Sequence, residues 1–320
     1  MTRRANNQGS TKNPLVSVVI PSYNRRGLVG ETLESVLSQN WPELEVILVD
    51  DGSDDGTAAY VREQFSDAVT IHRQKNQGPS IARNTGLCKS HGDYLTTMDS
   101  DDIMPPESIK CRMESLLAHP KANAAYGGYI HEHKDGKSEQ KKVAPKSEDQ
   151  PWPKGDLLYK YALDPFFRHT DLLFERQLLP ENGRLYPPKM AKNEDYIMVL
   201  KILARAWCVP CYRRTTHLRA VAGEERLRYC YDRILKTDIE AFDRAIAEDQ
   251  VLSRRLEPIR AKIRARHLMG IANAARKIGD SHKFRQYFRK AREADPDSVR
   301  GFKAFRRYLL SFFHFSRNKG

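Results

Sequence analysis

The N-terminal half of the chain alternates short β-forming runs with stretches of helical periodicity. Four runs have the composition of buried strands: Val16–Pro21, Glu45–Asp50, Ala68–Arg73 and Tyr94–Asp99. Between them, apolar residues recur at the spacing of a helix face, as in the segment 28–37. This alternation is typical of a mostly parallel sheet with flanking helices. The sequence therefore predicts an α/β domain.

Three of the four predicted strands end in polar, turn-forming sequence. These segments are Pro21–Asn24, Asp50–Gly56 and Asp99–Asp102. Ligands of open α/β sheets bind outside the carboxyl ends of the strands, so we expect the three segments to form one nucleotide-type pocket with an acidic floor. The chain contains neither the Gly-rich dinucleotide fingerprint after its first strand nor a P-loop. These two common nucleotide-binding classes are therefore disfavoured.

The acidic strand ends each allow two interpretations. Asp99–Asp102 holds carboxylates two residues apart, which can bind Mg²⁺ or Mn²⁺ and so join the chain to a diphosphate. It can equally be a solvated turn that caps the next helix. Asp50 and Asp51 can accept hydrogen bonds from a ribose or a base, or belong to a helix cap. Arg83 can approach phosphates or lie on an ordinary helix surface.

Taken together, the motifs resemble the family 2 inverting glycosyltransferases, which have the GT-A fold. The resemblance covers about residues 14–220 and rests on the order VSVVIPSYN, ETLESVLSQ, VILVDDGSDDGT, NQGPSIARNTGL, GDYLTTMDSDD and NEDYIMVLKI. It implies transfer of a sugar from a nucleotide-diphospho-sugar, most often a UDP-sugar, to an acceptor hydroxyl. It also implies Mn²⁺ or Mg²⁺ as cofactor and a role in cell-surface polysaccharide or lipopolysaccharide synthesis, with a saccharide or lipid-linked saccharide as acceptor.

The resemblance also implies roles for individual residues. The nucleotide-binding set would be Pro21, Tyr23, Asn24, Asp50, Asp51, Arg83, Asp99 and Ser100. Asp101 would be the direct metal ligand, and Asp99 the other half of the DxD unit. Asp195 and Glu194, at the start of a predicted helix, would be the catalytic residues, with Asp195 as the base that takes the acceptor's proton. The alternative for this pair is negative charge that suits the helix dipole.

Three further residues are expected near the phosphates or the acceptor. His217 and Arg219 follow a predicted strand at 208–214, where the family often has a basic loop over the donor phosphates. The sequence YRRTTHLRAVAGEER departs from the family's usual short His-containing pattern. His169 precedes DLLFERQLL, at the place where the family lines its acceptor site. The alternative for His217 is a lone exposed His without such a role.

Two other segments are given structural interpretations. Residues 131–155 are polar and without periodicity, which predicts a long loop. Cys208 and Cys211 form a C-x-x-C, but no second such pair follows. We therefore expect both cysteines to act as small apolar residues in a strand.

The positive charge of the chain lies mainly in its C-terminal third. Of a net +13, residues 224–320 contribute +11, from 24 Lys and Arg against 13 Asp and Glu. We predict a disordered N-terminus at 1–13, a GT-A domain at 14–222 and a basic helical appendage at 223–320. Within the appendage, residues 263–298 resemble one helix-turn-helix unit of tetratricopeptide type.

The composition of the last residues of the appendage bears on the location of the protein in the cell. Residues 300–320 combine Phe and Leu with Lys and Arg, which suits a helix lying on an anionic membrane surface or one docked on the appendage. No apolar run approaches the roughly 18 residues of a membrane span, and residues 1–13 lack the apolar stretch of a signal peptide. We expect a cytoplasmic protein, either free or bound peripherally to the inner face of the cytoplasmic membrane.

Two rival functions stay open at this stage. A sugar nucleotidyltransferase also needs a nucleotide pocket and metal carboxylates, but it would carry a Gly-rich basic loop where this chain has PSYNRRG. A polyanion-binding protein would use the basic tail, and its affinity would fall steeply with salt. We expect no nucleic acid partner, because the charge lies outside every motif.

Overall fold

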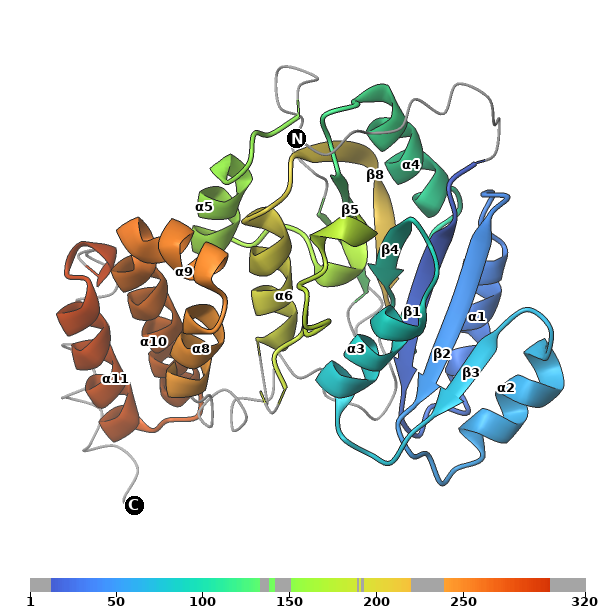
Figure 1. The fold of residues 1–320 in the computed structure, drawn as a ribbon. Coiled ribbons are helices and arrows are strands. Elements are labelled where there is room, and N and C mark those ends of the chain that lie inside the picture. The colour runs from blue at the N-terminus through green and yellow to red at the C-terminus, as the bar shows by residue number, and fades with distance from the viewer. Residues whose placement is uncertain are drawn as a thin grey trace.

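The computed structural model describes residues 13–132, 138–141, 151–188, 190, 193–219 and 239–299 (Figure 1). The predicted disordered N-terminus, apart from residue 13, lies outside the described residues. The predicted membrane-surface helix at 300–320 lies outside them as well. Among the described residues, no helix has the length and apolarity required to cross a membrane.

One eight-stranded sheet forms the centre of the molecule. Its strands are β1 (Val16–Ser22), β2 (Leu44–Asp50), β3 (Thr70–Arg73), β4 (Tyr94–Thr97), β5 (Ala124–Glu132), β6 (Ser138–Lys141), β7 (Leu172–Glu175) and β8 (Cys208–Leu218). They lie in the order β3-β2-β1-β4-β7-β5-β6, and β8 pairs with β5. The first four strands are mutually parallel, β8 is parallel to β5, and the pairs made by β6 and β7 are antiparallel. The predicted α/β sheet is confirmed.

Helices flank this sheet and continue beyond it (Figure 1). They are α1 (Val29–Leu37), α2 (Thr57–Phe65), α3 (Pro79–Lys89), α4 (Ser108–Ala118), α5 (Asp156–Leu163), α6 (Glu194–Leu203), α8 (Ile239–Ala247), α9 (Gln250–Leu256), α10 (Arg260–Lys277) and α11 (Ser281–Ala294). Short 3₁₀ turns are η1 (His169–Asp171), η2 (Arg176–Leu178), η4 (Glu257–Ile259) and η5 (Asp297–Val299).

The alternation of side chains along β1 creates two hydrophobic layers. Val18 and Ile20 point to the layer that also holds apolar residues of α1, α2 and α4. Val19 points to the opposite layer, which holds Leu87 of α3 and residues of α5 and α6. Gly86 lets α3 approach the sheet closely, because a Cβ there would lie 2.2 Å from the Val19 side chain. Strands buried on both faces explain why the sequence showed continuous apolar runs.

The second layer continues into the predicted appendage. Phe242 and Ile246 of α8, Leu252 of α9 and Ile263 of α10 belong to the same buried cluster as α5 and α6. Beyond it, α10 and α11 form the expected helical hairpin, with Gly279 at φ +81° and the Asp280 side chain accepting from the Lys283 amide. The domain boundary at 222 stays a prediction, and this hydrophobic core crosses it.

The expectation of one long loop over residues 131–155 is wrong in part. Strand β5 extends to Glu132, β6 pairs with it at 138–141, and Trp152 forms a bridge with Cys208. The polar sequence gave no strand signal, and β6 lies at the edge of the sheet, where charged residues are common because they discourage pairing with another chain. Residues 133–137 and 142–150 lie outside the described residues.

The interpretation of the cysteines also needs correction. Cys211 forms a disulfide with Cys111, which lies 100 residues earlier in α4. Cys208 is buried with a free thiol, as expected of a small apolar residue. The C-x-x-C spacing pairs Cys208 with Cys211 in sequence, whereas the disulfide joins Cys211 to Cys111. The packing of α4 beside β8 brings these two cysteines together.

Candidate active site

The loops after β1 and β2 are joined by hydrogen bonds. The Asn24 amide donates to Ser53 Oγ at 3.0 Å, and Asn24 Oδ1 accepts from the Asp54 amide at 3.0 Å. Asn24 has a left-handed backbone, with φ 51°, which Asn tolerates better than most residues. Pro21 is buried at the end of β1, whereas Tyr23 is 46% exposed. The loop therefore presents the Tyr23 ring outward beside the carboxyl ends of the strands.

The two carboxylates at the end of β2 have different surroundings. Asp50 is fully buried, accepts from the Ser53 amide and lies 3.1 Å from Arg73 Nε, so it holds the turn together. Asp51 accepts from the Gln77 and Gly78 amides at 2.9 and 2.8 Å. Asp51 thus ties the β2 loop to the start of α3. Binding of a nucleotide by Asp50 and Asp51 stays a prediction.

Arg83 and Asp99 form the centre of the candidate site. Arg83 Nη2 lies 2.7 Å from Asp99 Oδ1, and His169 Nε2 approaches the same oxygen at 3.4 Å. Burial opposes ionisation of Asp99, but the charges of Arg83 and His169 outweigh it and lower the pKa of Asp99 to about 2. Burial also lowers the pKa of His169 to about 4, despite the neighbouring carboxylates. Near neutral pH this is an ionised Asp99 between a guanidinium and a neutral imidazole.

The Glu194–Asp195 pair begins α6, as the sequence predicts, and joins this cluster. Arg83 Nη1 lies 3.7 Å from Glu194 Oε1, and His169 Nδ1 lies 3.9 Å from Asp195 Oδ2. The Asn193 cap has φ 68° and starts the helix abruptly at the pair. Burial and the charge of Asp195 raise the pKa of Glu194 to about 7. Asp195 is the more accessible of the two, with 38% of its side chain exposed against 17%.

His217 and Arg219 lie at the end of β8. His217 is inside the strand and pairs with Ile103, so the expectation that it follows the strand in a loop is wrong. Arg219 Nε donates to the Asp101 carbonyl at 2.8 Å, and its Nη1 lies 2.6 Å from Glu31 Oε2. Arg219 therefore binds the acidic turn to α1. Its expected contact with donor phosphates stays a prediction.

Two residues of this cluster were not predicted from the sequence. The Tyr186 ring lies 5.2 Å below the Arg83 guanidinium, and its hydroxyl shares a 2.8 Å hydrogen bond with Thr97. Arg168, next to His169, lies close enough to Asp195 for attraction between their charges to raise the Arg168 pKa despite its burial. Tyr186 lies in GRLYPPKM, which carries no recognisable pattern, but the position of Arg168 beside His169 was a usable signal.

The turn after β4 has the donor set for a divalent cation bound together with a diphosphate. Such a cation needs only one or two carboxylates, because phosphate and water oxygens complete its coordination. Asp99 and Asp101 offer hard oxygen ligands, and both Arg83 and His169 contact the Oδ1 atom of Asp99 rather than Oδ2. In the part of the chain that the structure describes, no group of three or more His, Cys, Asp and Glu forms a self-sufficient metal site. Ser100, between the two carboxylates, is buried.

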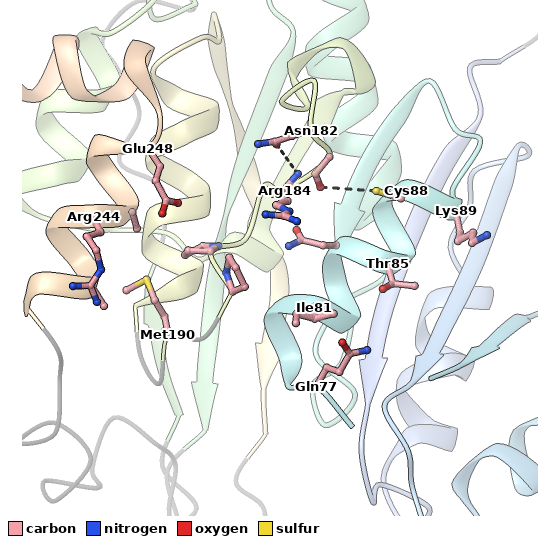
Figure 2. Close-up of a pocket in the computed structure, with 16 residues that line it drawn as sticks. Gln77, Ile81, Thr85, Cys88, Lys89, Asn182, Arg184, Met190, Arg244 and Glu248 are labelled. Carbon is pink, nitrogen blue, oxygen red and sulfur yellow. Dashed lines mark hydrogen bonds between the residues drawn. The ribbon is translucent and has the colours of Figure 1, made fainter. Parts of the chain in front are cut away.

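Two cavities adjoin the cluster and differ in relevance. One of about 560 Å³ is lined by Arg168, Asn193 and Asp195 together with residues of α5 and α10. The other, of about 870 Å³, lies between α3, the segment 182–190 and α8, and none of the predicted site residues lines it (Figure 2). Only the first cavity therefore gives a substrate access to a candidate catalytic side chain.

The fold and the site together define an α/β protein with a nucleotide-type site at the carboxyl ends of its parallel strands. The profile of the family described as "Glycosyl transferase family 2" matches residues 17–182, more than half of the chain. The chain belongs to glycosyl transferase family 2. The resemblance drawn from the motifs is confirmed, and with it the GT-A fold.

Named relatives come from several bacteria. A Bacillus subtilis protein named as a teichuronic acid biosynthesis glycosyltransferase, TuaG, is 29% identical over 199 residues, or 61% of this chain and 74% of the relative. Escherichia coli chondroitin synthase is 37% identical over 105 residues, or 32% of this chain and 15% of the relative. The chain spans less than half the length of several other curated relatives, for example 43% of a Haemophilus influenzae glycosyltransferase.

Solved structures share the fold at low sequence identity. S. aureus TarS 1-349 in complex with UDP-GlcNAc has a TM-score of 0.56 at 19% identity, covering 94% of this chain and 92% of that chain. The mannosyltransferase PcManGT from Pyrobaculum calidifontis, in complex with GDP-Man and Mn²⁺, has a TM-score of 0.54 at 20% identity, covering 95% of this chain and 80% of that chain. Because identity is this low, the two likenesses show the fold alone.

Proposed function

We propose that the chain transfers a sugar, with inversion, from a UDP-sugar to a hydroxyl of a saccharide or lipid-linked saccharide during cell-surface polysaccharide synthesis. The family assignment supports glycosyl transfer over nucleotidyl transfer or polyanion binding. TuaG is named for the biosynthesis of teichuronic acid, and the structure of TarS was solved in complex with UDP-GlcNAc. The donor, the acceptor class and the stereochemistry are part of the proposal.

The position of Asp195 carries the proposal. Its carboxylate lies 3.9 Å from His169, which in turn lies 3.4 Å from Asp99 at the end of β4. On its other side Asp195 lines the 560 Å³ cavity. A donor on the β4 side and an acceptor in the cavity would therefore meet at Asp195, which is where an inverting reaction needs its base.

The bond changes follow from this placement. Asp195 takes the proton from the acceptor hydroxyl, and the acceptor oxygen forms a bond to the anomeric carbon. The bond from that carbon to the diphosphate oxygen breaks on the opposite face, and the nucleoside diphosphate leaves with the electron pair. Arg83, with its fork of donors, is within reach of the leaving group and would stabilise its negative charge.

The other predicted residues bind the donor. Tyr23 and Asn24, after Pro21, would line the base, and Asp51 would accept from the uracil imide. Asp101, with Asp99, would hold Mn²⁺ or Mg²⁺, which supplies positive charge to the diphosphate when bound. Ionised Asp99 suits this task, since its pKa lies far below neutral pH. A cytoplasmic protein with residues 300–320 on the inner membrane surface remains our prediction for the location.

A donor screen tests the proposed function. Thermal unfolding of the full chain is followed with UDP-, GDP- and dTDP-sugars, each with and without Mn²⁺. A ligand that binds only the folded state raises the melting temperature. At a ligand concentration of a hundred times Kd, the free energy of unfolding increases by about 2.7 kcal/mol. We expect a UDP-sugar to do so, and Mn²⁺ to increase the effect. No shift with any nucleotide-sugar would reject the proposal, and a shift with GDP-sugars alone would reject the donor.

A further inference from the structure

The cavity beside Asp195 is built from two parts of the chain that are far apart in sequence. Arg168 and Asn193 line it from the sheet-containing part, and Arg266, His267 and Asn273 line it from α10. The helix is fixed there by the hydrophobic core that it shares with α5 and α6. A substrate that reaches Asp195 through this cavity therefore contacts the helical region that lies beyond the match to the family.

Two guanidinium groups line this cavity without a direct ion pair, although the charge of Asp195 attracts Arg168. Within the described residues, neither Arg168 nor Arg266 forms an ion pair. Arg168 Nε is buried and makes no hydrogen bond, while the guanidinium carbon lies 6.0 Å from the centre of the Tyr129 ring. Arg266 Nη1 makes a long bond of 3.4 Å to the Ala162 carbonyl, and the Arg266 side chain also interacts with the Tyr196 hydroxyl. A buried guanidinium N–H without an acceptor, such as Arg168 Nε, gains most from an anion brought in by a ligand.

The charges of the described lining residues favour one class of acceptor. Asp195 is their only carboxylate, and Arg168 and Arg266 exceed it by one positive charge. Asp195 is needed for the hydroxyl, so it cannot also neutralise both arginines. A neutral sugar would leave the lining with its net positive charge, whereas a phosphate or a carboxylate would balance it and matches the paired donors of a guanidinium.

We propose that this cavity binds the acceptor, and that Arg168 and Arg266 select an acceptor that carries an anionic group, a phosphate or a carboxylate, near its reactive hydroxyl. The inference rests on the proposed function. It gives the helical region a role in acceptor specificity, in addition to any membrane contact of the tail.

The test compares small acceptor fragments on the full chain. The probes are glycerol 3-phosphate, methyl β-D-glucuronide and, as the neutral control, methyl β-D-glucoside, at matched ionic strength. Binding is measured by titration in the presence of the UDP-sugar found in the donor screen, or of UDP with Mn²⁺. We expect at least one anionic probe to bind at least tenfold more tightly than the neutral one. Whichever anion binds identifies the group as phosphate or carboxylate.

Variants of α10 show whether the arginine is responsible. Arg266→Gln should weaken binding of the anionic probe about ten- to hundredfold, the usual worth of a charge-assisted hydrogen bond, and leave the neutral probe unaffected. Arg266→Lys should restore part of the loss, and it replaces the Gln variant if that variant does not fold. Lys262→Gln removes the same charge from an exposed position on α10 and should leave binding unchanged.

The outcomes separate the two proposals. Equal binding of charged and neutral probes, or equal losses in Arg266→Gln and Lys262→Gln, would overturn the anion selectivity. Donor binding in those same samples would then leave the proposed function standing. If no nucleotide-sugar binds the wild-type chain, the proposed function fails and this inference fails with it.

Discussion

Two neighbouring carboxylates at the start of α6 have different surroundings. Glu194 turns toward Arg83 and is mostly buried, whereas Asp195 lines the cavity and is more exposed. A base must reach the proton that it removes, so the greater accessibility of Asp195 favours it over Glu194 for the proposed role. Glu194 is better placed to hold Arg83 than to meet a substrate.

Replacing the proposed base tests this division. Asp195→Asn keeps the shape of the side chain but removes its ability to take a proton. We expect kcat to fall about 10²- to 10⁴-fold, while the melting-temperature shift caused by the donor stays as in the wild type. Asp67→Asn, at an exposed position outside every motif, serves as the matched control. Full turnover by the Asp195 variant would show that another group is the base.

Glu194 makes stability depend on pH in a predictable direction. Its pKa is about 7 in the folded protein against 4.5 as the reference value, so the folded state holds this proton more tightly. The raised pKa therefore adds to the stability of the folded state at low pH, and this added stability is lost as the pH rises through 7. Glu194→Gln should therefore be more stable than the wild type at pH 8.5, by about 2–3 kcal/mol, and no more stable at pH 4.5. Urea unfolding at the two pH values measures the difference, and a pH-independent difference would contradict the shifted pKa.

At the scale of elements, a buried arginine holds the turn that carries His169. Arg112 of α4 is fully buried and donates to the Ser108 and Thr170 carbonyls and to the Ser108 and Thr96 hydroxyls. Burial lowers the pKa of Arg112 to about 10, despite the nearby Asp171, so it stays charged at neutral pH. The packing of α4 on the sheet thereby sets the position of η1.

Removing this arginine should damage both stability and the site. Arg112→Met leaves a buried carbonyl in η1 without its donor, and we expect a loss of about 3 kcal/mol in the free energy of unfolding. The variant should also have lower kcat, because His169 and Arg168 lie in or beside η1. Urea unfolding and donor turnover check the two effects. A loss below about 0.5 kcal/mol would mean that the hydrogen bonds are not structurally important.

The sequence predicted those elements whose signal is local. β1, β2 and the start of α6 were recognisable because apolar runs and acidic strand ends lie within a few residues of each other. β6 gave no signal, since an edge strand needs no apolar run. The Cys111–Cys211 disulfide and the contact of Tyr186 with Arg83 depend on residues that approach only in the folded chain. The cavity was unpredictable for the same reason, since α10 and α6 lie far apart in sequence.

At the scale of the whole molecule, one hydrophobic core connects the sheet to the helices after residue 239. Side chains of α8, α9 and α10 pack in the same cluster as α5 and α6, and Arg205 Nη2 also lies 2.7 Å from Asp249 Oδ1. The motifs place the expected chemistry in the first two-thirds of the sequence, which contribute only +2 of the net +13 charge. The structure shows that the basic third also completes the cavity beside Asp195.

Truncation measures this dependence. A chain that ends at residue 222 exposes the apolar faces of α5 and α6, at a cost of roughly 25 cal/mol for each Å² of apolar surface that becomes exposed. We expect it to aggregate or to unfold without a cooperative transition. A chain that ends at residue 299 keeps the described helices and serves as the control. Cooperative unfolding and normal donor binding by the shorter chain would show that the two regions are independent.

The central claim is direct displacement of the nucleoside diphosphate by an acceptor hydroxyl that Asp195 deprotonates. Its most direct test is proton NMR of the product formed from an α-linked UDP-sugar and an accepted saccharide. The account predicts a β-linked product, formed together with UDP by the wild-type chain and essentially absent with Asp195→Asn. An α-linked product, or undiminished formation of the β-linked product by the variant, would contradict it.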